Sequence, residues 1–134
     1  MRTKLLLAVP FFLLFVGFQV PTVHQDIVNN ITGYLKTANT REISKNLAST
    51  VELTILSEEN VYSKVQAELI LKDFFAKHQP VSTKIIRRLD SNPNYHFAVV
   101  QLNTTTGTFR VNFSLKDTGG RFLITDMRID FNKE

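Results

Sequence analysis

Two neighbouring stretches of the chain, residues 95–104 and 107–116, carry an apolar residue at every second position. Strict alternation of this kind indicates β-strands with one buried face and one exposed face. In the second stretch the apolar members are Phe109, Val111, Phe113 and Leu115. Because only Thr105 and Thr106 separate the two stretches, the sequence predicts a β-hairpin.

The register of this hairpin follows from which residues each alignment would bury. A two-residue turn at 105–106 sets residue 104 opposite residue 107. The buried face of the first strand is then His96, Ala98, Val100 and Leu102. A shift by one residue would bury Gln101 and Asn103 instead, at the cost of desolvating two amides. We therefore predict the alignment that pairs 104 with 107.

The strand that follows the hairpin is predicted by the same parity argument. Residues 117–120 contain two glycines and indicate a three-residue loop that sets Leu115 opposite Leu123. The buried face of the last strand would then be Leu123, Thr125, Met127, Ile129 and Phe131. A four-residue loop would bury three charged residues, so we reject it.

The strand that precedes the hairpin carries a cation onto the buried face. The Ser-Asn-Pro-Asn stretch 91–94 is a strong turn signal between residues 84–90 and the strand that starts at residue 95. With a four-residue loop, Arg87 lies on the buried face close to His96. A loop one residue longer or shorter places Arg88 there instead, and the sequence leaves both alternatives open.

Helical periodicity dominates the chain before these strands. We expect an amphipathic helix over about 24–37, then a short helix introduced by a capping-box pattern at Asn39. A strand over 51–55 and a polar turn over 57–60 lead to a longer helix from Ser63 to about residue 77. Helices followed by an antiparallel run of strands define an α+β fold with the helices on one face of a curved sheet.

The first 22 residues have the pattern of a secretory signal peptide. Arg2 and Lys4 precede the uncharged stretch 5–18, which is shorter than the roughly 20 apolar residues of a membrane span. We expect cleavage after Thr22, which leaves a single domain over residues 23–134. The protein is then exported to the bacterial periplasm or the extracellular space. The alternative is an uncleaved segment that anchors the protein in the inner membrane.

Composition excludes several classes of function. The chain has no cysteine, which rules out disulfides and thiolate chemistry. Removing Arg2 and Lys4 lowers the formal net charge from +4 to +2, and Arg87-Arg88 is the only basic cluster, so nucleic acid is not an expected partner. The three histidines lack metal-ligand spacing, and there is no nucleotide-binding motif. We therefore expect neither a metal nor another cofactor.

Three motifs carry a family resemblance. The stretches 51–55 (VELTI), 72–78 (KDFFAKH) and 122–130 (FLITDMRID) resemble a family of small exported bacterial proteins of unknown function. The order of elements over about 25–131 resembles the nuclear transport factor 2-like, cystatin-like superfamily, which implies a cone formed by a curved sheet around a long helix. That superfamily includes isomerases, dehydratases, hydrolases and non-catalytic binding domains, so the resemblance implies a fold rather than an activity.

Enzymes of this superfamily work with polar side chains at the mouth of the cone, and we name candidates accordingly. The candidate pocket consists of Arg87, His96, Tyr34 and Thr125. A histidine can move a proton near neutral pH, and a guanidinium can hold an anion. The predicted buried face holds no aspartate that could act as a general base. We therefore expect a non-catalytic domain that binds a small ligand or an exported protein, with an isomerase- or hydrolase-type enzyme using His96 and Arg87 as the alternative.

The nominally exposed face of the sheet also carries apolar residues. These are Phe97, Val99, Phe122 and Ile124. Such a group predicts a second buried surface, which we interpret as a homodimer contact. The alternative is that the first helix or the N-terminal segment covers it.

Overall fold

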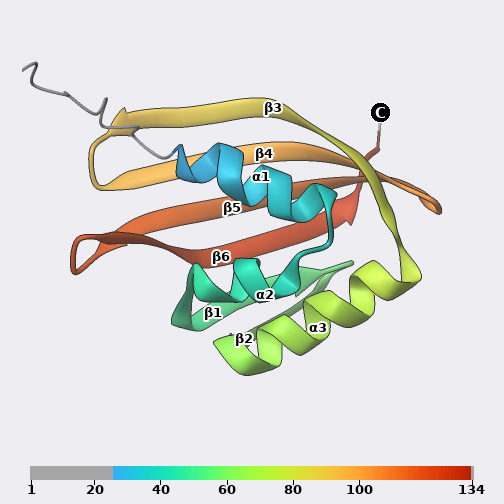
Figure 1. Cartoon of the computed structure of the whole chain (residues 1–134), viewed down its shortest axis with the longest axis horizontal. Helices are drawn as coiled ribbons and strands as arrows, with labels where there is room; N and C mark the ends of the chain where they lie inside the picture. The colour runs from blue at the N-terminus through green and yellow to red at the C-terminus, as the bar shows by residue number, and fades with distance from the viewer. Residues whose placement is uncertain (1–25, 134) are drawn as a thin grey trace, which may run out of the picture.

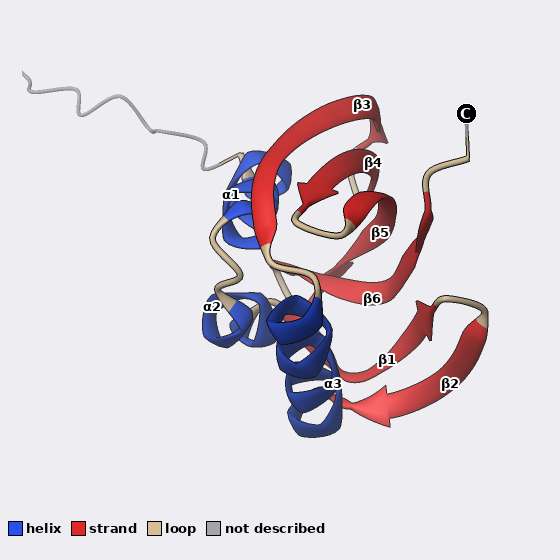
Figure 2. Ribbon diagram, turned by 90° about the vertical axis from the view of Figure 1, so that its right-hand side faces the viewer, coloured by secondary structure: helices blue, strands red, loops and turns tan. Residues whose placement is uncertain are grey.

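The computed structural model describes residues 26–133, which form helices on one side of a curved six-stranded sheet (Figures 1 and 2). The helices are α1 (Ile27–Lys36), α2 (Thr40–Lys45) and α3 (Lys64–Lys77). The strands are β1 (Leu47–Ile55), β2 (Glu58–Ser63), β3 (Pro80–Asn92), β4 (Tyr95–Thr104), β5 (Gly107–Thr118) and β6 (Arg121–Phe131). The predicted signal peptide, residues 1–22, lies outside the described residues.

The sheet is mainly antiparallel, as predicted. Its strand order is β2-β1-β6-β5-β4-β3, and β1 runs parallel to β6 whereas every other neighbouring pair is antiparallel. We call the side of the sheet that carries the helices the inner face and the opposite side the outer face. The predicted α+β class is confirmed.

Side-chain caps set where the helices begin. Asp26 accepts a hydrogen bond from the backbone N–H of Asn29, so α1 begins at Ile27 rather than three residues earlier. The predicted capping box of Ser63 and Gln66 is present at the start of α3. These caps set the first residue of each of the two helices.

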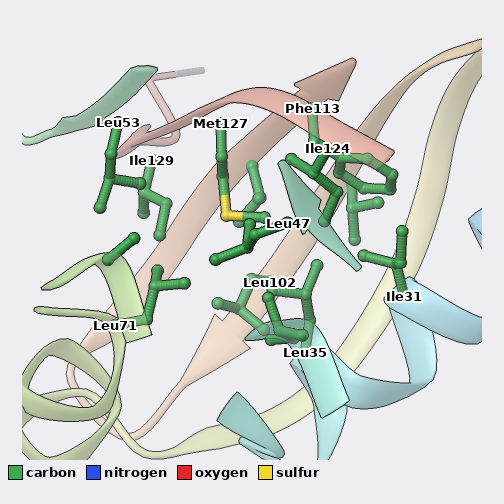
Figure 3. Packing of buried hydrophobic residues seen from close by; sticks show 14 of the residues in the cluster. Ile31, Leu35, Leu47, Leu53, Leu71, Leu102, Phe113, Ile124, Met127 and Ile129 are labelled. Carbon is green, nitrogen blue, oxygen red and sulfur yellow. The ribbon is translucent and has the colours of Figure 1, made fainter. Parts of the chain in front are cut away.

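A single hydrophobic core fills the space between the helices and the inner face (Figure 3). The helices contribute mainly Val28, Ile31, Leu35, Ile43, Ala67, Leu71, Phe74 and Phe75, each at most 5% exposed. The sheet contributes, among others, Val100, Leu102, Phe113, Ile124 and Met127, each at most 1% exposed. Full burial of a side chain of this size is worth about 1.5–3 kcal/mol, so this layer accounts for most of the stabilising energy.

The hairpin of β4 and β5 has the predicted register. Thr104 lies opposite Gly107, and Val100 lies opposite Val111. Ala98, Val100 and Leu102 are fully buried on the inner face. The parity argument is therefore confirmed for the strands in which alternation is unbroken.

Strand β2 was missed by the sequence analysis. The predicted polar turn over 57–60 is wrong, because the turn consists of Leu56 and Ser57 and the chain enters β2 at Glu58. β2 lies at the edge of the sheet and almost all of its residues are exposed. An edge strand with both faces in water has no burial pattern to reveal it.

The predicted register between β5 and β6 is wrong because β6 contains a bulge. Leu115 lies opposite Ile124 instead of Leu123, while Ser114 lies opposite Asp126, so Thr125 is the extra residue. Ile124 is consequently fully buried, and Leu123 faces the other side, opposite Lys116. Beyond the bulge the predicted parity is again correct, since Met127 and Ile129 are buried on the inner face. Phe131 shares that face, opposite Phe109, but is 56% exposed at the end of the strand.

Strand β3 is also irregular, and this decides which arginine faces inward. The turn between β3 and β4 contains only Pro93 and Asn94, and the pairing shifts between Ile85 and Arg87. Arg88 therefore lies opposite the buried Ala98 on the inner face. Arg87 lies opposite Val99 on the outer face and is exposed.

Candidate functional site

The four residues of the candidate pocket lie on different parts of the fold. His96 is on the inner face of β4, whereas Arg87 is on the outer face of β3, so the predicted pair does not meet. Tyr34 is half-buried on α1 against the edge of the core. Thr125 lies in the β6 bulge, where its hydroxyl donates to the carboxylate of the adjacent Asp126.

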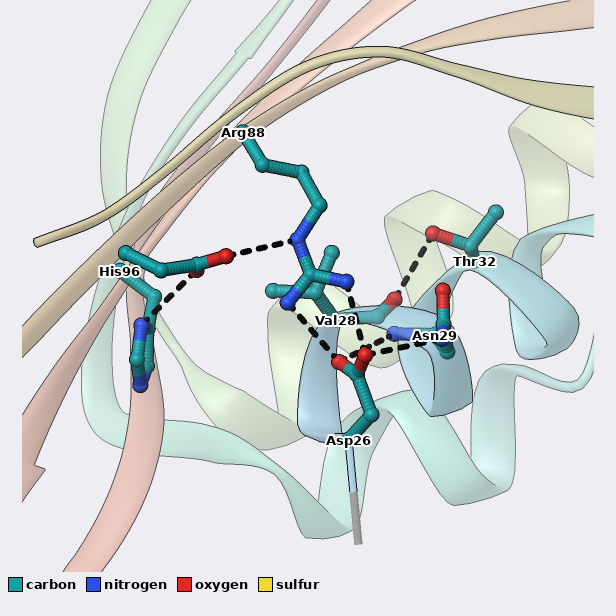
Figure 4. Close-up of polar contacts among 7 residues, drawn as sticks. Asp26, Val28, Asn29, Thr32, Arg88 and His96 are labelled. Carbon is teal, nitrogen blue, oxygen red and sulfur yellow. Dashed lines mark hydrogen bonds and ion pairs between the residues drawn. The ribbon is translucent and has the colours of Figure 1, made fainter.

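The position predicted for Arg87 is occupied by Arg88, which joins β3 to the start of α1 (Figure 4). Its Nη1 and Nη2 donate to the two carboxylate oxygens of Asp26, at 2.8 and 3.0 Å. Its Nε donates to Oδ2 of Asp90 at 2.9 Å. All three guanidinium nitrogens thus bind carboxylates of the protein itself, and we call Asp26, Arg88, Asp90 and His96 the latch.

The electrostatics of the latch favour the charged pair. The hydrogen bonds from Arg88 lower the pKa of Asp26 below its usual value, and the same bonds raise the pKa of Arg88. Asp26 is the N-cap of α1, where a negative charge also interacts favourably with the helix dipole. The latch therefore holds the N-cap of α1 on the sheet and commits three of the five guanidinium N–H donors of Arg88, with its charge, to carboxylates of the protein.

His96 lies at the edge of the latch. Its Nδ1 is 3.0 Å from Oδ1 of Asp90, but the approach lacks hydrogen-bond geometry, and Nδ1 is buried without a hydrogen-bond partner among the described residues. Its ring packs on that of Phe122, with the ring centroids 4.4 Å apart. The histidine is thus held between a carboxylate and an aromatic ring at the rim of the core.

The sequence contains part of the signal for the latch. Asp26 stands directly before the first residue of a helical pattern, which is the position that an N-cap occupies. Arg88 and Asp90 are two residues apart on one strand and so share a face. The sequence does not indicate that Asp26 binds Arg88, because the two residues are 62 positions apart.

The predicted homodimer surface is divided between the two faces of the sheet. Phe122 packs on His96, on the inner side of the sheet, and Ile124 is fully buried there. The β6 bulge is the cause, because it reverses the parity of this end of the strand. Phe97 and Val99 stay on the outer face, where Leu89, 44% exposed, lies opposite Phe97. We call Leu89, Phe97 and Val99 the outer patch.

A second feature of the outer face is a groove of about 690 Å³. It is lined by Leu56, Ser57, Arg110, Asn112, Arg128, Asp130, Phe131 and Lys133, and we call it the outer groove. None of the predicted pocket residues lines this groove. Charges on an exposed strand face are ordinarily explained by cross-strand pairing. The sequence also predicts a turn over 57–60, whereas the turn that closes the groove consists of Leu56 and Ser57.

The described part of the chain shows neither a metal-ligand cluster nor a helix of membrane-spanning character. Within residues 26–133, no group of three or more histidine, aspartate or glutamate side chains is arranged to hold a metal ion. Across the same residues, none of the helices has the length and apolar character needed to cross a membrane.

Comparison with known proteins identifies relatives of the same architecture. A model of a family described as a domain of unknown function (DUF4783) matches residues 28–130. A DUF4783 family protein from Bacteroides uniformis is 27% identical, with a TM-score of 0.77 over 81% of this chain and 100% of that one. Another from Bacteroides ovatus is 27% identical, with a TM-score of 0.73 over 78% and 94%. No curated protein matches the chain.

A more distant structure extends the comparison to the superfamily. An NTF2-like protein of unknown function from Cytophaga hutchinsonii is 14% identical, with a TM-score of 0.58 over 80% of this chain and 88% of that one. At this identity the likeness shows the fold alone. The predicted nuclear transport factor 2-like fold is therefore confirmed.

Proposed function

Because the chain belongs to the DUF4783 family of domains of unknown function, with an NTF2-like fold, we propose its role from the geometry: it is an exported, non-catalytic domain that binds a protein partner through the outer face of its sheet. The observation that carries this proposal is the filled space between the helices and the inner face. In a cone of this type, that space is where a buried ligand would lie. Recognition is therefore assigned to the outer surface.

The packing of the inner face supports this assignment. Leu35, Leu71 and Leu102 meet in the middle of the core, and all three are fully buried (Figure 3). Protein interiors are packed to the density of organic crystals, so side chains of this kind leave little room for a substrate. A ligand in the cone would have to displace core residues.

The alternative of an isomerase- or hydrolase-type enzyme has weak support. It was built on His96 and Arg87, which lie on opposite faces of the sheet. The arginine that does lie near His96 is Arg88, and its three nitrogens already bind Asp26 and Asp90. A guanidinium held in this way stabilises the fold rather than a developing charge on a substrate.

The partner that we assign to the outer patch is a second copy of the chain. Leu89 and Phe97 lie directly opposite each other on β3 and β4, with Val99 two residues further along, so they form one continuous apolar surface. An apolar patch can contact its own copy across a two-fold axis without any charge having to be matched. Three side chains bury a small area, so the expected dimer is weak and depends on protein concentration.

Export is the second part of the proposal, and it rests on residues 1–22. The two basic residues and the uncharged stretch that follows are typical of a secretory signal, and a chain without cysteine folds equally well in an oxidising compartment. N-terminal sequencing of the protein recovered from the periplasmic fraction tests this directly. A mature protein that begins near Val23 supports cleavage, and an intact Met1 in the membrane fraction supports the anchored alternative.

Sedimentation velocity over a range of concentrations tests the dimer. Residues 23–134 should shift from monomer to dimer as the concentration rises, and Phe97→Glu should stay monomeric, because a buried carboxylate without a partner is costly. Leu69→Glu is the matched control, since Leu69 is 62% exposed on α3, on the opposite side of the sheet. A wild-type protein that is monomeric at every concentration, or a Phe97→Glu variant that still dimerises, would contradict the assignment.

A further inference from the structure

The two edges of the sheet differ in how far they are protected from pairing with another chain. An edge strand presents unpaired backbone N–H and C=O groups, and natural sheets block such edges with prolines, bulges or a covering element. At one edge, β3 begins with Pro80, and its pairing with β4 shifts in three places. These irregularities make the β3 edge a poor template for a further strand.

The other edge, formed by β2, lacks these devices. β2 forms the margin of the sheet (Figure 2). Residues 58–63 pair with residues 50–55 of β1 without a shift in register, and they include no proline. All of them except Tyr62 are exposed, and Val61 in the middle of the strand is 70% exposed. The β2 edge is therefore regular and accessible.

The register shows which backbone groups of β2 face away from β1. In an antiparallel pair, alternate residues exchange hydrogen bonds with the neighbouring strand, and the others point away from it. The N–H of Ser63 donates to the side chain of Gln66 rather than to β1. Glu59 and Val61 have the same parity as Ser63, so their N–H and C=O groups also point outward. These groups are available to pair with an added strand.

The outer face beside this edge carries negative charge. Glu52 lies directly opposite Asp126 of β6 and diagonally across from Glu59 of β2. Together with Thr54, Met127 and Arg128, these carboxylates line a hollow of about 350 Å³. The neighbouring Glu59 raises the pKa of Glu52 above its ordinary value, because the two carboxyl groups share a hydrogen bond and repel each other when both are charged.

The described part of the protein does not neutralise this charge. Among the ion pairs of residues 26–133, none includes Glu52, Glu59 or Asp126. Arg128, the cation that lines the hollow, binds Asp130 instead. The surface next to the β2 edge therefore favours a cation from outside.

The glutamates decide which strand this edge accepts. A second copy of β2 would add negative charge to a surface that already carries an excess, which is unfavourable. A lysine or arginine on an added strand would lie beside Glu59, and its long side chain would extend toward Glu52. An apolar side chain would pack on the exposed Val61. Since Glu59 and Val61 are two positions apart on one face, the added strand needs its basic and apolar residues at the same spacing.

We propose that the β2 edge binds an extended segment of a partner protein as an additional strand, with a basic residue against Glu59 and Glu52 and an apolar residue, two positions away, against Val61. Backbone hydrogen bonds to Glu59 and Val61 supply the affinity, and the two side chains supply the specificity. The site lies at the opposite edge of the sheet from the outer patch on β3 and β4. It therefore goes beyond the proposed self-contact and does not depend on it.

Titration of ¹⁵N-labelled residues 23–134 with three blocked peptides, followed by NMR, tests the proposal. The peptide Lys-Thr-Val-Thr-Lys-Thr-Val should shift the amide signals of Glu59 and Val61, and at saturation it should slow hydrogen exchange at both N–H groups about tenfold. The same peptide with glutamate in place of both lysines should bind about tenfold more weakly. A peptide with proline in place of each threonine keeps the charge but cannot pair as a strand, so it should not slow exchange.

Several results of this titration would overturn the proposal. An absence of shifts with the lysine peptide would exclude the site, and equal affinity of the glutamate peptide would exclude the assigned charge. Equal binding of the proline peptide would show attraction between charges without strand addition. Slow exchange at Glu59 and Val61 that appears without peptide, as the protein concentration rises, would assign the edge to a second copy. Phe97→Glu should leave peptide binding unchanged, so the dimer and the peptide site fail independently.

A variant pair tests on which face of β2 the basic residue lies. Glu59→Gln should weaken binding of the lysine peptide about threefold, the loss expected from one exposed ion pair. Glu58→Gln is the matched control, because Glu58 is the adjacent exposed glutamate but lies opposite Ile55 and lines a different hollow beside α3. Both side chains are exposed, so both variants should keep the wild-type fold. Equal affinities of Glu58→Gln and Glu59→Gln would refute the placement of the basic residue on the outer face.

Discussion

Replacing Arg88 by methionine tests whether the latch holds α1 on the sheet. Arg88→Met keeps most of the apolar stem and removes the guanidinium, which makes three hydrogen bonds to Asp26 and Asp90. Charge-assisted hydrogen bonds are the strong ones, but Asp26 is 38% exposed and Arg88 29%, so solvent screening reduces their value. We expect a loss of about 1–2 kcal/mol in the free energy of unfolding.

Urea denaturation followed by circular dichroism measures this loss, and Arg87→Met is the matched control. Arg87 is the adjacent residue, is exposed on the outer face and takes no part in the latch. Its replacement should change the free energy of unfolding by less than about 0.5 kcal/mol. A result in which Arg87→Met is as destabilising as Arg88→Met would refute the inward placement of Arg88.

The pH dependence of the same experiment identifies the partner of Arg88. The pKa of Asp26 is lower in the folded protein than its ordinary value of 3.8, because Arg88 donates hydrogen bonds to its carboxylate. The stability that comes from this pair is therefore fully present above pH 3.8 and is lost as the pH falls through the lower pKa of the folded state. The difference between wild type and Arg88→Met should shrink below pH 3.8, whereas a difference that stays constant would exclude Asp26 as the partner.

Two further substitutions test the irregular parts of the sheet. Ile124→Ala should lower the free energy of unfolding by about 2–4 kcal/mol, since Ile124 is fully buried. Leu123→Ala should lower it by less than about 1.5 kcal/mol. If urea denaturation gave the larger loss for Leu123→Ala, Leu123 would be the buried residue and β6 would have no bulge. Replacing Leu56-Ser57 by Asn-Gly should raise the free energy of unfolding by about 1–2 kcal/mol, because both residues have positive φ. Urea denaturation measures this gain, and an unchanged free energy of unfolding would show that the turn is not strained.

The sequence predicted the fold best where the side chains alternate without interruption. The register of β4 and β5 and the capping box at Ser63 were read correctly, because each depends on residues close together in the chain. The identity of the inward arginine was left open, because it depends on the loop before residue 95 and on a shift of pairing inside β3. Parity cannot detect a bulge, since one extra residue reverses the faces without changing the composition.

The candidate site was predicted less well than the fold, for a related reason. Phe122 and Ile124 were assigned to the outer face because the β6 bulge was not visible, and Arg87 was paired with His96 because the irregularity of β3 was not visible either. The outer groove was not predicted at all. Its residues come from β5, from β6 and from the distant turn at Leu56 and Ser57, and the parallel pairing of β1 with β6 brings them together.

The sequence by itself determined the α+β class, the central hairpin and the capping box of Ser63 and Gln66. These features follow from local periodicity and from hydrogen bonds between near neighbours, which any stretch of chain carries within itself. The tertiary structure alone decided which arginine faces the core, that Asp26 is its partner, and where the outer surface is hollowed. Each of these depends on strand pairing between distant residues and on bulges whose energy is set by packing of the whole sheet, so no local pattern encodes them.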